Sequence, residues 1–121
     1  MDNKIWRFLI KILISTLAVF FTSWILPGVE INQFTTAIVV ALVLALLNAF
    51  LKPLLVLLTI PVTLFTLGFF LLVINAFIIQ LAGHFVAGFK VNNFLWAFLF
   101  GIILSLVTSL LEHIANQNTK E

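Results

Sequence analysis

The sequence contains no cysteine and very little charge. Only 8% of its 121 residues are charged, whereas soluble domains average about 25%. The absence of cysteine excludes disulfides and thiolate metal sites. The net charge of +2 gives no basic surface for nucleic acid, so we expect no nucleic-acid partner. Because so short a chain cannot hide a 64% hydrophobic composition in one water-soluble core, we predict an all-α integral membrane protein with the lipid bilayer as its solvent.

The few polar residues form none of the patterns that carry catalysis or hold a cofactor. The sequence has no paired carboxylates, no His-x-x-x-His spacing, no nucleophile beside a base and no glycine-rich phosphate loop. Its two central acidic residues, Glu30 and Glu112, are predicted on opposite sides of the membrane. We therefore predict no enzyme, no catalytic residue, no cofactor and no metal, and the sequence identifies no small-molecule substrate.

Long apolar runs dominate what is present. Between Ile12 and Leu111 the only formal charges are Glu30, Lys52 and Lys90. A membrane crossing needs about 20 apolar residues. The first run is interpreted as a retained signal-anchor helix, because no small-residue cleavage site follows it. We predict four transmembrane helices followed by a polar tail, at residues 5–26, 34–51, 67–86, 94–112 and 113–121.

The segment between the second and third helices is apolar but contains Pro53 and Pro61. A helix over residues 53–66 would reach only about 21 Å, short of the ~30 Å hydrocarbon core. Two alternatives remain open: a re-entrant or interfacial hairpin, or a kink of the second helix at Pro53 with Pro61 opening the third. Hydroxyls that can bond the carbonyls freed by the prolines are on Thr59, Thr63 and Thr66.

The second half of the chain repeats the first at an offset of 60 residues. Residues 26–34 align with residues 86–94 without a gap. The identical pairs in this stretch are Gly28/Gly88, Asn32/Asn92 and Phe34/Phe94. We therefore predict one membrane domain built from two helix–loop–helix repeats. The first repeat covers residues 5–51, the connecting segment residues 52–66, and the second repeat residues 67–112.

Small residues recur at every fourth position of the second and fourth helices. Such stripes let helix backbones approach closely in lipid. The simplest prediction packs the second helix against the fourth across a pseudo-two-fold axis, and the alternative is packing between subunits of a homo-oligomer. The helix-packing residues are Ala37, Ala41, Ala45 and Ala49 in one stripe and Ala97, Gly101, Ser105 and Ser109 in the other.

The distribution of basic residues predicts the topology. Three basic residues precede position 12, which places the N-terminus in the cytoplasm by the positive-inside rule. Lys52 and Lys120 then fall inside and only Lys90 outside. Both repeats consequently have the same orientation. We predict a multi-pass protein of the bacterial cytoplasmic membrane with both termini cytoplasmic.

The two outer loops alternate apolar and charged residues, which is typical of half-buried strands. We predict a short β-ribbon formed by residues 28–32 and 88–92, with Glu30 and Lys90 as an outer-loop pair that sets the register. The alternative is two separate polar loops.

Three amide side chains fall inside the predicted helices: Asn48, Asn75 and Gln80. Such residues face a neighbouring helix or a polar cavity. Their simplest role is hydrogen bonding between helices. The alternative is a substrate or ion path, for which Asn75, near mid-membrane, is the best candidate.

Several short motifs resemble those of a known family, and the resemblance covers about residues 5–111. They are Leu26-Pro27-Gly28-Val29, Phe34-Thr35-Thr36-Ala37, Leu46-Leu47-Asn48-Ala49, Lys52-Pro53-Leu54, Leu58-Thr59-Ile60-Pro61, Phe65-Thr66-Leu67-Gly68 and Val73-Ile74-Asn75-Ala76. The chain resembles the YvlD-like family, catalogued as four-helix phage holin superfamily IV. Ala87 departs from the proline that the family commonly repeats in its second loop. The resemblance implies a bacterial membrane protein, and the family name implies a holin, which permeabilises the cytoplasmic membrane.

Three functions follow from these features. The first is a small non-enzymatic inner-membrane protein, structural or envelope-associated, that contacts other membrane proteins. The second is a holin-like oligomeric pore former. The third is a small channel or transporter with a site near Asn75.

Overall fold

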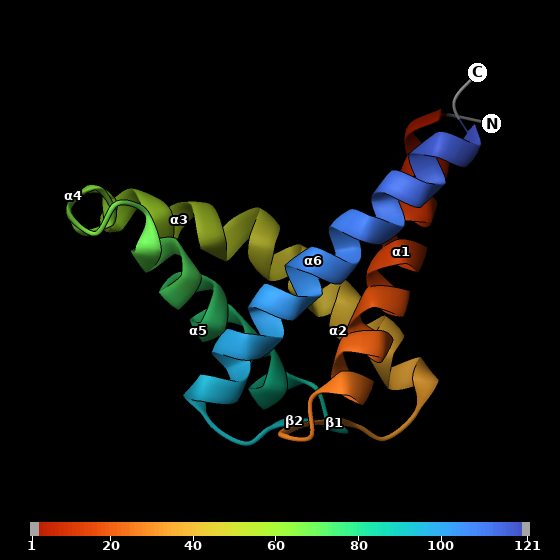
Figure 1. Cartoon of the computed structure of the whole chain (residues 1–121), viewed down its shortest axis with the longest axis horizontal. Coiled ribbons are helices and arrows are strands. Elements are labelled where there is room, and N and C mark those ends of the chain that lie inside the picture. The colour runs from red at the N-terminus through yellow and green to blue at the C-terminus, as the bar shows by residue number, and fades with distance from the viewer. Residues whose placement is uncertain (1–2, 120–121) are drawn as a thin grey trace.

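The computed structural model describes residues 3–119 and is almost entirely helical (Figure 1). Three long apolar helical stretches, one shorter apolar helix and a two-stranded ribbon confirm the predicted fold class. The helices are α1 (Asn3–Ile25), α2 (Phe34–Leu46), the π-helix η1 (Leu47–Leu51), α3 (Lys52–Leu58), α4 (Ile60–Phe65), α5 (Phe69–Phe85) and α6 (Phe94–Thr119), and the strands are β1 (Val29–Ile31) and β2 (Phe89–Val91).

Each repeat forms a helical hairpin, α1 with α2 and α5 with α6. The strands join the two hairpins at one end, the ribbon end, whereas the chain termini lie at the other, the termini end (Figure 1). The two hairpins therefore have the same orientation. Each also contacts the other in an equivalent way, because α1 packs on α6 and α2 packs on α5. This exchange of partners is what a pseudo-two-fold axis between the repeats requires.

The ribbon closes one end of the molecule and confirms the predicted strand pairing. The strands are antiparallel, and the Cα partners are Val29 with Val91, Glu30 with Lys90, and Ile31 with Phe89. The backbone N–H of Asn32 donates to the Gly88 carbonyl at 3.1 Å, and the backbone N–H of Asn92 donates to the Gly28 carbonyl at 2.9 Å. These two bonds are equivalent at an offset of 60. Within residues 3–119, Glu30 and Lys90 form no ion pair, so backbone bonds and not charge hold the register.

A dry core lies beneath the ribbon. The side chains of Ile78, Phe89 and Phe100 are at most 1% exposed, and the rings of Phe89 and Phe100 are 5.6 Å apart between centroids. Gly28 is also buried, and a Cβ atom there would collide with the ring of Trp96. The absence of a side chain at Gly28 is therefore what allows the first loop to approach α6 so closely.

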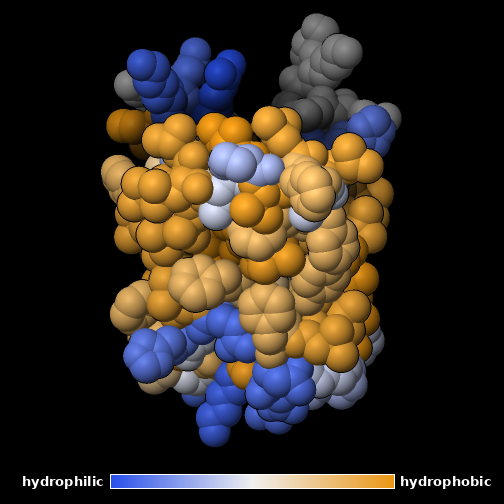
Figure 2. All heavy atoms as spheres, turned by 90° about the vertical axis from the view of Figure 1, so that its left-hand side faces the viewer, coloured by the Kyte–Doolittle hydropathy of each residue, from blue (hydrophilic) through white to orange (hydrophobic). Residues whose placement is uncertain are grey.

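The outer surface carries a broad belt of apolar side chains between polar ends (Figure 2). Three helical stretches are long and apolar enough to cross a membrane, namely Asn3–Ile25, Phe34–Leu58 and Phe94–Ala115. The fourth, Phe69–Phe85, has 17 residues. It reaches about 25 Å, somewhat less than a hydrocarbon core of ~30 Å.

The first part of the connecting segment continues the second helix. α2 passes through η1 into α3, so that the helix runs unbroken to Leu58, with Pro53 in the first turn of α3. Pro61 lies in the first turn of α4 and so opens a separate short helix instead of the third long one. Leu67 and Gly68, with φ values of 58° and 90°, then turn the chain into α5.

Threonine hydroxyls bond carbonyls around these breaks, although not the carbonyls expected from the prolines. The Thr59 hydroxyl donates to the Leu55 carbonyl at 2.8 Å, and the Thr66 hydroxyl donates to the Val62 carbonyl at 3.0 Å. Both carbonyls lie near the ends of α3 and α4, and each also accepts a backbone hydrogen bond from the same threonine, at 3.1 Å for Leu55 and 3.0 Å for Val62. The Thr63 hydroxyl is buried without a hydrogen-bond partner.

The fourth helix is longer than predicted. α6 continues to Thr119, beyond the expected end at Glu112. The stretch after Glu112 contains neither proline nor glycine, so nothing in the backbone ends the helix where the polar residues begin. The expected tail 113–121 is thus helical to Thr119. Positions 120 and 121, including the predicted inside position of Lys120, lie outside the described residues.

The predicted seam between the second and fourth helices is wrong. α6 packs mainly on α5 and α1, and α2 packs on α1 and α5. The reason is visible at Gly101, where a Cβ atom would collide with the Asn75 amide and lie 3.1 Å from Ile79 Cδ1. The small residue thus admits α5, the partner of α6 within its own hairpin. Small-residue stripes permit close approach but do not select which neighbour approaches.

Candidate functional site

The two small-residue stripes separate towards the termini end and leave a cavity between them. Near the ribbon end their residues are buried, namely Ala37 and Ala41 of α2 and Ala97 and Gly101 of α6. Further along, Ala45, Ala49, Ser105 and Ser109 line a cavity of about 600 Å³. Its walls come from α1, from α2 with η1, and from α6, and α5 contributes Asn75. The stripes therefore face each other across a space and do not pack together.

The cavity lies on the pseudo-two-fold axis of the molecule. Most of its lining consists of pairs of residues that are equivalent at the offset of 60. The pairs are Ser15/Asn75, Leu44/Leu104, Ala45/Ser105, Asn48/Thr108, Ala49/Ser109 and Lys52/Glu112. In each of these pairs except the leucines the two side chains differ. The cavity therefore has a symmetric backbone frame and an asymmetric chemical surface.

Several polar side chains in the cavity have no hydrogen-bond partner among residues 3–119. Neither Asn48 nor Asn75 forms a side-chain hydrogen bond with another residue of the described part of the chain, and the same holds for Ser105. Asn75 lies ten residues before the end of α5, about 15 Å along the helix and so near mid-membrane. An amide in hydrocarbon without a hydrogen bond costs about 2 kcal/mol or more. These groups are therefore suited to water or a polar ligand inside the cavity.

Three charged side chains line the same cavity, Lys11, Lys52 and Glu112. None of them forms an ion pair with another residue within positions 3–119. Lys52 and Glu112 each lie eighteen residues after the first residue of α2 and of α6. This is about 27 Å along the helices from the ribbon end, close to the edge of a ~30 Å hydrocarbon core. The charges thus mark the mouth of the cavity, and Asn75 lies deeper.

One wall of the cavity has no counterpart in the second repeat. α1 contributes Phe8, Lys11 and Ile12. The equivalent positions 68, 71 and 72 do not line the cavity. Lys11 is therefore a second cation at the mouth, beside Lys52. The equivalent position in the second repeat carries no acidic residue that would balance its charge.

A break in helical geometry supplies part of the lining. Asn48 and Ala49 belong to the π-helix η1, directly before Lys52 and Pro53. Such π-bulges are frequent at functional sites because they redirect side chains and free backbone groups. The sequence indicated a kink at Pro53. It carried no signal that the preceding turn would be π-helical or would border a cavity.

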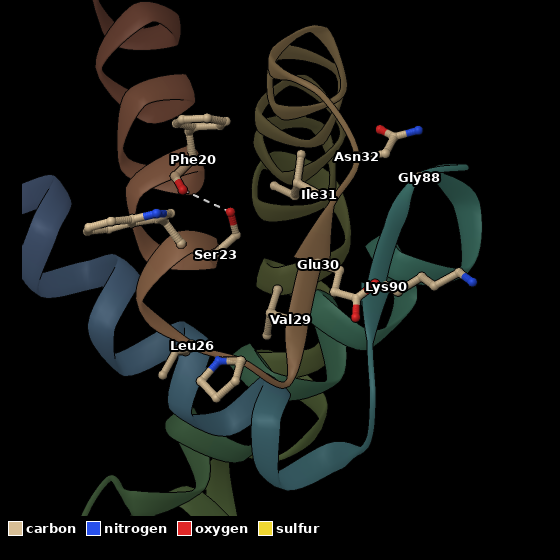
Figure 3. A pocket seen from close by; sticks show the side chains of 11 residues that line it. Phe20, Ser23, Leu26, Val29, Glu30, Ile31, Asn32, Gly88 and Lys90 are labelled. Carbon is tan, nitrogen blue, oxygen red and sulfur yellow. Dashed lines mark hydrogen bonds between the residues drawn. The ribbon is translucent and has the colours of Figure 1, made fainter.

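Two further pockets flank the ribbon and are also related by the repeat. The first, of about 690 Å³, includes Phe20, Ser23, Trp24, Val29, Glu30, Ile31 and Asn32 (Figure 3). The second, of about 470 Å³, is lined by the equivalent residues Gln80, Gly83, His84, Phe89, Lys90, Val91 and Asn92. The structure thus brings Asn48 and Asn75 together in one cavity but places Gln80 at the opposite end of the molecule.

The two acidic residues singled out from the sequence are far apart, and the described residues form no metal site. Glu30 and Glu112 lie at opposite ends, and no group of three His, Cys, Asp or Glu residues within residues 3–119 is arranged to hold a metal ion. What the termini-end cavity offers chemically is hydrogen bonding and charge.

Comparisons with known proteins agree with this architecture. Residues 6–110 match the family described as "Mycobacterial 4 TMS phage holin, superfamily IV". The chain is 32% identical over 107 residues to the "Uncharacterized membrane protein YvlD" of Bacillus subtilis, which covers 88% of this chain and 90% of that protein. It is 35% identical over 112 residues to the "Uncharacterized protein SCO3922" of Streptomyces coelicolor, and the match covers 84% of this chain and 90% of that protein.

No solved structure matches the chain. The family match instead covers nearly all of the residues that form the four helices, the ribbon and the cavity. The chain therefore belongs to the four-helix phage holin family of superfamily IV.

Proposed function

We propose that the protein is a non-enzymatic, multi-pass protein of the bacterial cytoplasmic membrane that binds a polar group in the termini-end cavity from the cytoplasmic side. The observation that carries this proposal is the cavity itself, which holds unpartnered polar groups as deep as Asn75. The cytoplasmic orientation rests on the basic residues near the N-terminus, by the positive-inside rule. This proposal favours a site near Asn75 over a purely structural role in the envelope.

The dry core supports binding from one side over an open pore. Between the cavity and the ribbon lie the buried side chains of Val40, Ile79 and Phe100. Water and ions need polar groups or a wide lumen to pass, and this layer provides neither. A single copy of the chain is therefore expected to admit solutes from the termini end and stop them at the core.

A chain without cysteine allows a direct test by thiol labelling. Ser105 lies about 16 Å along α6 from the ribbon end, inside the proposed polar cavity. We expect a Ser105→Cys variant in sealed vesicles to react with a membrane-impermeant maleimide added on the side of the termini. Leu106→Cys is the matched control, because the adjacent side chain is 63% exposed on the lipid-facing surface and should stay unlabelled.

Two labelling results would contradict the proposal. Equal reactivity at positions 105 and 106 would mean that no polar cavity exists in the membrane. Labelling of Ser105→Cys from both sides would mean that a continuous path crosses the core.

The second candidate function is a holin-like oligomeric pore. It is favoured by family membership and by the exposure of Asn48, Ser105 and Ser109, which several copies would turn towards a shared lumen. Liposomes loaded with a large dye separate the two functions. The binding proposal predicts that liposomes containing the protein retain the dye, and release of the dye supports the pore.

A further inference from the structure

Charge at the mouth of the termini-end cavity is unbalanced. Lys11 and Lys52 contribute two positive charges, Glu112 contributes one negative charge, and none is ion-paired within residues 3–119. The site therefore carries a net charge of one positive unit. A ligand with one negative charge, such as a phosphodiester, would neutralise it.

Donors for a phosphate group surround these charges. Thr108 and Ser109 present hydroxyls on α6, and Asn48 presents an amide on η1. Lysine binds phosphate as a point charge, whereas hydroxyl and amide groups supply directional hydrogen bonds. The lining thus combines both kinds of contact on opposite walls of one cavity.

The rims of the cavity are apolar and face the bilayer. Beside the lining residues Ala45 and Ala49 stand Leu46 and Phe50, which are 60% and 74% exposed. Beside Ser105 and Ser109 stand the equivalent residues Leu106 and Leu110, which are 63% and 59% exposed. A ligand that fits this arrangement has a charged head at interfacial depth and apolar chains next to it.

We infer that the cavity mouth binds the headgroup of an anionic phospholipid, with its phosphate between Lys11 and Lys52. Basic sites between transmembrane helices on the cytoplasmic side are suited to anionic headgroups. A soluble phosphate ester would satisfy the charges but would leave the apolar rims without a role. This inference rests on the proposed function, because it specifies what the cavity binds.

Lipid retention by the purified full chain tests the inference. Phosphatidylglycerol or phosphatidylcholine with the same acyl chains is added to the protein in non-ionic detergent, and bound lipid is counted by native mass spectrometry. We expect phosphatidylglycerol to be retained in preference, and Lys11→Gln and Lys52→Gln each to lower its affinity about fivefold. The control Arg7→Gln removes a cation at the same end of α1 but outside the cavity, and should change little.

Glu112→Gln is a control for the possibility that the lysine variants lose affinity because they misfold. Removing the carboxylate eliminates repulsion of the phosphate, so the affinity for phosphatidylglycerol should rise a few-fold, a gain that misfolding cannot produce. The inference is overturned if Arg7→Gln is as harmful as Lys52→Gln, if phosphatidylcholine or phosphatidylethanolamine binds equally well, or if glycerol 3-phosphate displaces the lipid. Should Ser105→Cys still be labelled from the termini side in that case, the polar cavity stands and only its ligand was misidentified.

Discussion

The two ends of the molecule use the same pseudo-symmetry in opposite ways. At the ribbon end the equivalent bonds Asn32–Gly88 and Asn92–Gly28 tie the repeats together. At the termini end the equivalent residues Lys52 and Glu112 face a common cavity without touching. One axis therefore runs through a packed interface and then through a space. The comparison predicts that the contacts that stabilise the fold are concentrated at the ribbon end, whereas the proposed binding site lies at the termini end.

Side-chain chemistry explains the difference. In lipid, helices associate through close packing and interhelical hydrogen bonds, because burial of apolar groups alone gives no driving force. The ribbon end has tight contacts such as Phe89 on Phe100, whereas the termini end has charges and amides that cannot be packed dry. The helices therefore do not close against one another at the termini end, because their facing surfaces are not complementary.

Loss of a large core side chain should have the greatest effect on stability. Phe100→Ala leaves a void beside Phe89 and is expected to lower the free energy of unfolding by about 3 kcal/mol. Unfolding in mixed micelles by sodium dodecyl sulfate, followed by circular dichroism, measures it. Ser105→Ala at the other end should change stability by less than about 0.5 kcal/mol. Equal losses would abolish the distinction between the two ends.

Adding one methyl group at the ribbon end tests how tightly it is packed. Gly28→Ala should cost about 1–3 kcal/mol, because its Cβ atom meets the ring of Trp96. Gly83→Ala is the control: the nearest side-chain atom, of Val91, is 3.5 Å away, and alanine favours the helix by about 1 kcal/mol. The same unfolding assay should give opposite signs for the two variants. If Gly83→Ala is destabilised, the free space around the added Cβ atom does not predict the effect of the substitution on stability.

Filling the cavity should leave stability nearly intact while removing access. Ala45→Leu places an apolar side chain among the lining residues and is expected to change the unfolding free energy by less than about 1 kcal/mol. Maleimide labelling of Ser105→Cys should fall sharply in this background. Leu42→Met, on an exposed position of the same helix, should leave labelling unchanged. If labelling is undiminished with Ala45→Leu, the thiol at position 105 is not reached through the cavity.

The smallest expected effect concerns the outer charges of the ribbon. Glu30→Lys places like charges on directly opposed residues, and should cost about 0.5 kcal/mol, less at high salt. Glu30→Gln should be neutral, since no ion pair is lost. The difference in unfolding midpoint between 20 mM and 500 mM salt measures the charge term. A large loss with Glu30→Gln would mean that charge, and not backbone bonding, holds the register.

Sequence patterns predicted the features that depend on one-dimensional order. Apolar runs and sparse charges predicted four helices, and the ungapped alignment around Gly28 and Gly88 predicted strands that pair with Glu30 opposite Lys90. Both follow from periodicity and spacing alone. The ends of the first and third helices, before Gly28 and Gly88, were likewise close to those observed, whereas the second helix continues past Pro53 to Leu58.

The parts that were missed depend on which surfaces meet in three dimensions. The stripes identify the residues that share a helix face, but only the fit of Gly101 against Asn75 shows that α6 turns this face towards α5. The cavity follows from that choice, because the remaining residues of both stripes are left facing each other. Asn48 and Asn75 line this cavity together, and the sequence alone placed them on one axis only under the hypothesis of a channel or transporter.

The chemical differences within the repeat pairs have a consequence for how such a site can arise at all. If the two hairpins were separate copies of one chain in a symmetric dimer, the residue opposite Lys52 would be a second Lys52, and the cavity would be lined by two identical halves. Joining the hairpins in one polypeptide removes that constraint, so that Glu112 occupies the position opposite Lys52 and Asn75 the position equivalent to Ser15. Covalent duplication thus allows a two-fold frame to hold a ligand that is not itself symmetric.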